Sequence, residues 1–214
     1  MLLSERVIKA LLLIFEPTQA WERIFRSQRS FAFVLWLYLM PMLLITAGAE
    51  GYGLVRWGRE QMNVNQLKRF QPSEAVVYEF IHVLFTVGLL LLGARIIKSV
   101  GETFHGRHSY TQAFTTTAYG LSPLFLLRLL DAFPSISPWT TWSIGIVLCV
   151  SVLYQGVPRV MMPDPPHAFG LYLMSALLLI IITGLGRFVT AWYLQGHFKP
   201  LDEVISRLAA QLRF

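Results

Sequence analysis

Cysteine, charge and catalytic motifs are all scarce in this chain of 214 residues. Its one cysteine, Cys149, excludes an intrachain disulfide and any cysteine-based zinc or iron–sulfur site. Charged residues make up only 14% of the chain, whereas apolar residues make up 55%. The sequence contains no nucleophile–base–orienter set, no glycine-rich phosphate loop and no pair of catalytic carboxylates. We therefore expect neither an enzyme nor a cofactor.

The charges that are present are mostly basic, since 18 Lys and Arg against 12 Asp and Glu give a net charge of +6. In a soluble protein this excess would suggest a nucleic acid partner. In so apolar a chain, basic residues at the ends of membrane helices bind lipid phosphates and bias the topology. We therefore expect membrane lipids as partners, and no nucleic acid.

Five long apolar stretches dominate the sequence. A membrane helix needs about 20 mostly apolar residues. A backbone inside hydrocarbon must also satisfy its own hydrogen bonds, which a helix does. The sequence therefore predicts an all-α fold, a polytopic transmembrane helical bundle of about five spans. The predicted spans are residues 31–49, 75–94, 113–130, 139–157 and 168–189.

Amphipathic segments are predicted at both termini. Residues 2–15 carry apolar side chains on one helical face and charges on the other, as in a helix lying on a membrane. A second helix begins at Pro17 and either packs on the bundle or lies on the membrane surface. Past Pro200, apolar residues repeat at helical spacing. We divide the chain into N-terminal interfacial helices (1–30), a five-span membrane domain (31–190) and a C-terminal amphipathic helix (191–214).

Prolines and glycines predict where the helices begin and break. Pro72-Ser73-Glu74 is a helix-start signal for the second span. In the first span, Pro41 predicts a kink near Leu37, because proline removes a helical hydrogen bond. Gly120 and Pro123 predict that the third span is bent or broken.

Basic and aromatic residues near the span ends are predicted to anchor the bundle at the two membrane surfaces. Arg95 and Lys98 are expected to end the second span. Five basic residues precede the first span and four follow it, which favours a cytoplasmic N-terminus. The predicted anchors are Trp21, Arg23, Arg26, Arg95, Lys98 and Trp192.

Ionisable residues inside the predicted spans are candidates for function, because charges in a bilayer are expensive. Arg128 and Asp131 are three residues apart on one helix, so we expect them to pair with each other. Arg187 lies near a predicted interface and is expected to snorkel. The remaining candidates are Glu79 and His82.

Polar residues also gather at the start of the third span. Their hydroxyl groups either bond to helix carbonyls and neighbouring helices or line a polar path, which the predicted break keeps open. The candidate polar path consists of Gln112, Thr116, Tyr119, Arg128 and Asp131.

Two motifs have metal-ligand spacing, but neither predicts a metal site. Glu79-Phe80-Ile81-His82 has the Glu-x-x-His spacing of di-iron bundles, which need two such motifs. His105 and His108 lack a third ligand nearby in sequence, so we expect a solvated pair.

Several segments resemble the Yip (Ypt-interacting protein) domain family. Residues 17–24, PTQAWERI, are similar to its P-x-x-A-aromatic-x-x-I pattern before the first span. Residues 110–123, YTQAFTTTAYGLSP, resemble its third span, and LYQGV at 153–157 resembles its fourth-to-fifth span junction. The resemblance implies a five-span membrane protein of the compact bacterial kind.

Eukaryotic members of that family bind Rab-type GTPases through a cytoplasmic N-terminal region. This chain has about 30 residues before its first predicted span and lacks the Asp-Leu-Tyr-Gly-Pro stretch of those members, so GTPase binding gains little support. We expect a non-catalytic adaptor or organiser in the bacterial cytoplasmic membrane, acting with lipids and with another membrane protein or itself. The alternative is a small transporter or lipid-handling protein that uses a polar path along the third span.

Overall fold

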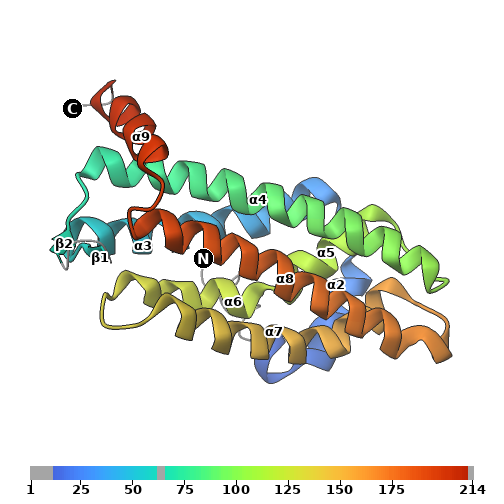
Figure 1. Ribbon diagram of the computed structural model, residues 1–214. Coiled ribbons are helices and arrows are strands. Elements are labelled where there is room, and N and C mark those ends of the chain that lie inside the picture. The colour runs from blue at the N-terminus through green and yellow to red at the C-terminus, as the bar shows by residue number, and fades with distance from the viewer. Residues whose placement is uncertain (1–11, 62–65, 212–214) are drawn as a thin grey trace.

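The computed structural model is a bundle of long, roughly parallel and antiparallel helices (Figure 1). It describes residues 12–61 and 66–211. Residues 12–15 are helical, and the rest of the predicted surface helix over 2–15 lies outside the described residues. Four stretches are helical, long enough and apolar enough to cross a membrane: Phe33–Arg56, Pro72–Thr103, Pro138–Met161 and Pro165–Leu194. They contain helices α3 (Met40–Arg56), α4 (Pro72–Thr103), α7 (Pro138–Met161) and α8 (Ala168–Leu194).

The third predicted span is broken, as Gly120 and Pro123 predicted. It consists of α5 (Tyr110–Gly120), α6 (Ser122–Leu127) and the 3-10 helix η2 (Arg128–Ala132). Pro123 has no N–H, and the Ser122 hydroxyl donates to the Tyr119 carbonyl at 2.7 Å, which satisfies an acceptor that the break leaves free. The predicted count of about five spans is therefore not confirmed as five spanning helices: the described chain has four, together with this broken segment.

The irregularity predicted in the first span takes the form of a π-helix. η1 (Phe33–Leu39) directly precedes α3, and the Met40 N–H donates to the Leu35 carbonyl, five residues back. Pro41 lies inside the continuous helix Phe33–Arg56, directly after η1, so its missing N–H leaves one carbonyl of the preceding turn without its helical donor. The wider turn thus accommodates the proline without ending the helix.

The bundle has two ends, which we name by the connections found there. At the hairpin end, strands β1 (Arg59–Gln61) and β2 (Gln66–Lys68) form a short antiparallel pair between α3 and α4. This pair was not predicted and is a small departure from an all-α fold. At the opposite end lie the turns between α4 and α5 and between α7 and α8, the latter containing the 3-10 helix η3 (Pro165–His167) (Figure 1).

The start of α4 was predicted correctly, but its end was not. Gln71 and Glu74 form a capping box, in which the Glu74 carboxylate accepts from the Gln71 N–H at 3.0 Å. The helix continues past Arg95 and Lys98 to Thr103. Lys98 pairs with Glu102 at 2.8 Å, one turn later, so these charges extend the helix beyond its apolar part.

Amphipathic helices flank the bundle at both ends of the described chain. α2 (Pro17–Ser27) packs on α7, and α9 (Lys199–Gln211) packs on α4. Trp21 is fully buried and its indole N–H donates to the Val152 carbonyl at 2.9 Å, so its predicted role as an interfacial anchor is wrong. Of the two alternatives for this helix, the structure has the one that packs on the bundle.

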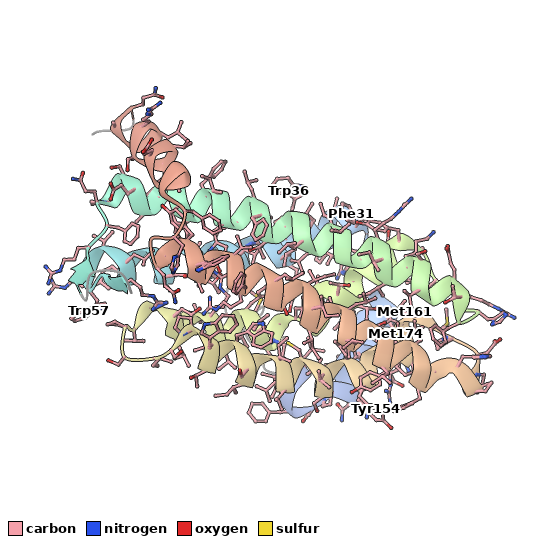
Figure 2. The ribbon with its side chains drawn as sticks, in the orientation of Figure 1. Phe31, Trp36, Trp57, Tyr154, Met161 and Met174 are labelled. Carbon is pink, nitrogen blue, oxygen red and sulfur yellow. The ribbon has the colours of Figure 1, made fainter. Side chains whose placement is uncertain are left out.

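Much of the outer surface is apolar, as a protein surrounded by lipid requires. Trp36, Tyr154 and Met174 are all exposed, and Figure 2 shows them on the outside of the bundle. A continuous core of apolar side chains joins α3, α4, α5, α7 and α8. The structure is that of a membrane protein.

Candidate functional site

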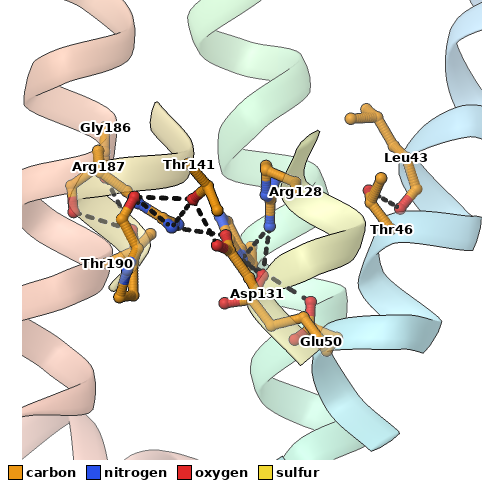
Figure 3. Close-up of polar contacts among 12 residues, drawn as sticks. Leu43, Thr46, Glu50, Arg128, Asp131, Thr141, Gly186, Arg187 and Thr190 are labelled. Atoms are coloured by element: carbon orange, nitrogen blue, oxygen red, sulfur yellow. Dashed lines mark hydrogen bonds and ion pairs between the residues drawn. The ribbon is translucent and has the colours of Figure 1, made fainter. Parts of the chain in front are cut away.

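Six ionisable side chains gather inside the bundle near its hairpin end, and Figure 3 labels four of them, Glu50, Arg128, Asp131 and Arg187. We call them the buried charge cluster: Glu50 of α3, Glu79 and His82 of α4, Arg128 and Asp131 of η2, and Arg187 of α8. Glu50, Glu79 and Arg187 each lie six or seven residues from the hairpin end of their helix. At a rise of 1.5 Å per residue this places the cluster about 10 Å inside the bundle.

Arg128 pairs with the first helix instead of with its own neighbour. Its Nη2 lies 2.6 Å from Oε2 of Glu50, whose side chain is 1% exposed, and 3.2 Å from Nδ1 of His82. The predicted pairing of Arg128 with Asp131 is therefore wrong. Both carboxylates are buried, and each arginine takes one from another element: Arg128 of η2 pairs with Glu50 of α3, and Asp131 of η2 is the partner of Arg187 of α8.

Asp131 pairs with Arg187 of α8. The Nη2–Oδ2 distance is 2.5 Å, and the other carboxylate oxygen accepts from the Thr141 hydroxyl at 2.6 Å. Arg187 also donates from Nε and Nη2 to the Pro138 carbonyl, at 3.1 and 2.9 Å (Figure 3). The expectation that Arg187 snorkels to the surface is wrong, because these partners hold its guanidinium inside the bundle at 8% exposure.

A glycine lets η2 approach α3 closely enough for the pair between Arg128 and Glu50 to form. A Cβ atom on Gly53 would lie 2.3 Å from the Ala132 carbonyl oxygen, so only glycine fits there. Sequence reasoning missed Glu50 because it placed the end of the first span at this glycine-rich stretch. One signal in the sequence could have indicated that Glu50 lies inside the span. The next basic residue, Arg56, comes only six positions later, and the residues between include Gly51 and Gly53, which allow another helix to pack closely.

Glu79 is the member of the cluster without a hydrogen bond. It is 7% exposed, neither carboxylate oxygen has a hydrogen-bond partner among the described residues, and Nδ1 of His82 lies 3.7 Å away. Three carboxylates face two guanidiniums, so one proton on Glu79 or His82 makes the cluster neutral. Such neutrality matters because an uncompensated buried charge is costly.

The cluster is poorly suited to hold a metal ion or a solute. Ligand atoms of Glu50, Glu79 and His82 lie within 4.8 Å of one another, but the guanidinium of Arg128 already contacts Glu50 and His82. The adjoining cavity, lined by both arginines and by apolar side chains of α4, α6 and α8, has about 70 Å³. A cavity of this size holds a few waters, whereas drug-sized ligands need about 300 Å³ or more.

A larger cleft opens at the surface of the hairpin end. It has about 820 Å³ and reaches inward to Arg187. Besides Arg187, it is lined by two tryptophans and two further arginines, residue types that favour the membrane–water interface: Trp57, Trp139, Arg59 and Arg69. One buried guanidinium nitrogen of Arg59, Nη2, has no hydrogen-bond partner among the described residues. The cleft can therefore accept an anionic group.

The structure brings only part of the candidate polar path together. Arg128 and Asp131 belong to the buried charge cluster, whereas Gln112 accepts from the Ser109 N–H at 2.7 Å, as the cap of α5. Thr116 donates back to the Gln112 carbonyl at 2.9 Å. The Tyr119 ring stacks on Tyr38, with 3.9 Å between centroids. The path stays a prediction.

The other predicted anchors lie on the surface at both ends of the bundle. Arg23, Arg26 and Arg95 are exposed, and Lys98 is half-buried. Trp192, near the hairpin end of α8, is 40% exposed and its ring lies 4.7 Å from that of Phe188. These positions are compatible with two interfacial belts.

Comparison with known proteins gives one family. The family model described as the Yip1 domain matches residues 11–187, which include every member of the buried charge cluster. No curated protein and no solved structure matches the chain. The resemblance seen in the sequence is thereby confirmed: the chain is an integral membrane protein and belongs to the Yip1 domain family.

Proposed function

We propose that this protein is a non-catalytic adaptor or organiser of the bacterial cytoplasmic membrane, with its N-terminus in the cytoplasm. The observation that carries the proposal is that the intramembrane charges bind one another. Arg128 with Glu50 and Arg187 with Asp131 link α3, η2 and α8, and the cavity beside them has about 70 Å³, which is room for a few waters. A bundle linked in this way serves as a rigid platform for partners.

Two surfaces support a role with lipid or protein partners. The cleft at the hairpin end combines tryptophans with arginines, which suits a lipid headgroup. α9 packs through Ile205 and Ala209, while Val204 and Leu208, four residues apart on another face, are 50% and 43% exposed. This apolar stripe is available to lipid or to a partner helix.

The alternative is a small transporter or lipid-handling protein. One observation favours it: the small cavity is lined partly by Leu121, Leu124 and Phe125, which belong to the break in the third segment. Transport would require this cavity to enlarge in a second state, with the two ion pairs separating. The adaptor proposal requires no such change.

Native mass spectrometry tests the proposal on protein extracted from its own membrane in nanodiscs. An adaptor predicts a stoichiometric second protein that is lost in the Val204→Glu, Leu208→Glu double variant. The same partner should remain in the matched control, Glu203→Gln with Arg207→Gln, which changes exposed polar residues of the same helix. A lone protein that retains a defined small molecule would instead favour the transport alternative.

A further inference from the structure

Three metal-ligating side chains meet at the opposite end of the bundle, away from the buried charge cluster. His105 lies in the turn between α4 and α5, whereas Asp164 and His167 lie in the turn between α7 and α8. Their ligand atoms lie within 4.8 Å of one another. The two imidazole rings are 5.4 Å apart between centroids. The two further ligands of His105 are thus not its sequence neighbour His108 but residues about 60 positions later, Asp164 and His167.

The backbone fixes His105 in an uncommon conformation. Its φ is 57°, in the left-handed region that residues other than glycine rarely occupy. The turn is held by the Gly106 N–H, which donates to the Gly101 carbonyl at 2.8 Å. The His105 N–H also donates to the Glu102 carbonyl at 3.2 Å, and the two bonds together form a Schellman motif, the common C-terminal cap of a helix, in which the residue after the cap is left-handed. Here the conformation places the His105 ring beside His167.

Asp164 and His167 are brought together by a short 3-10 helix. The His167 N–H donates to the Asp164 carbonyl at 2.8 Å, and in a 3-10 helix residues three apart lie above one another. Three prolines surround Asp164 and restrict the backbone: Pro163, Pro165 and Pro166. The backbone of this turn therefore loses little conformational entropy when a ligand binds.

We propose that His105, Asp164 and His167 bind a divalent transition metal ion of the zinc class. Two imidazoles and one carboxylate are a donor set that Zn²⁺ accepts, with a further position open to water or to a donor from a partner. Metal–ligand distances of about 2.0–2.2 Å require the donor atoms to approach further. Both histidines are exposed, so their rings are free to turn inward.

The contrast with the buried charge cluster supports this choice. There, the Arg128 guanidinium already contacts Glu50 and His82, where a metal cation would have to bind. Here, no ion pair involves Asp164 within the described part of the chain. His108 does not belong to the site, because its ring packs against Gly101 and Gly106, and burial lowers its pKa below the usual value. A bound ion would join the two turns of the opposite end.

Metal titration of the purified protein tests the site. The protein carries a tag without histidine, is treated with EDTA, and is titrated with Zn²⁺ by calorimetry and with Co²⁺ by visible absorption. We expect one equivalent to bind. His105→Ala, His167→Ala and Asp164→Asn should each weaken binding by at least about 100-fold, since losing even an outer-shell partner of a ligand costs 10- to 100-fold.

His197→Ala is the matched control, because His197 is exposed at the hairpin end. It should bind Zn²⁺ as the unaltered protein does. Thermal unfolding without metal should be the same for all variants, and added Zn²⁺ should raise the melting temperature of the unaltered protein and of His197→Ala only. Failure to bind one equivalent, or equal binding by all variants, would overturn the proposal.

Discussion

At the scale of single residues, the stability of the buried charge cluster depends on which charge is left without a partner. Glu50 is 1% exposed and is the direct partner of Arg128, while Glu79 is buried without a hydrogen bond. Removing one member of a buried pair leaves a buried charge uncompensated, which is more costly than the pair is favourable. The two glutamates should therefore respond differently to the same substitution.

Glu50→Gln should destabilise the protein by about 3–5 kcal/mol, because Arg128 loses its counterion. Glu79→Gln should change stability by less than about 1 kcal/mol, since the amide keeps the shape and removes an acid that no donor satisfies. Denaturant or thermal unfolding in one detergent measures both. Equal losses, or a larger loss for Glu79→Gln, would show that these contacts do not determine stability.

At the scale of elements, the docking of α2 on α7 depends on one close approach. The Trp21 ring lies over Gly156, where an added Cβ would be 2.3 Å from the ring. The indole N–H also bonds the α7 backbone at the Val152 carbonyl. α2 is therefore fixed to the bundle by a fitted contact as well as by its apolar face.

Gly156→Ala should destabilise the protein by about 1–3 kcal/mol, because the added methyl group overpacks the contact with Trp21. Gly88→Ala is the matched control, since nothing lies within 4 Å of a Cβ there. It should not destabilise the protein and should stabilise it by up to about 1 kcal/mol, because alanine has the higher helix propensity. Thermal unfolding of both variants tests this, and a destabilisation that is the same at both glycines would argue against it.

Elements also show what the sequence could and could not predict. The capping box at Gln71 and Glu74 and the break at Pro123 were predictable, because each depends on side chains within a few residues. The partners of Arg128 and Arg187 were not, because they depend on how η2 packs between α3 and α8, with its approach to α3 made possible by Gly53. The contact between His105 and His167 could not be predicted either, because these residues lie in two turns that are far apart in the sequence.

At the scale of the whole molecule, the bundle is open at its two ends and closed between them. One cleft, of about 820 Å³, lies at the hairpin end, and another, of about 280 Å³, lies beside Gln112 and Thr115 at the start of the third segment. Between these clefts, the two buried ion pairs and the stacked rings of Tyr38 and Tyr119 close the bundle. Thr116, in the middle of α5, is 1% exposed. Water should reach the two ends of the bundle but not this position.

The most direct test is the reactivity of a thiol placed at Thr116. Thr116→Cys and the matched Thr103→Cys, at the exposed end of α4, are each made with Cys149→Ala and treated in native membranes with a water-soluble thiol reagent. We expect the cysteine at 103 to react, and the one at 116 to react only after denaturation. Labelling at 116 in intact membranes, at a rate like that at 103, would contradict the closed bundle and favour a transport path.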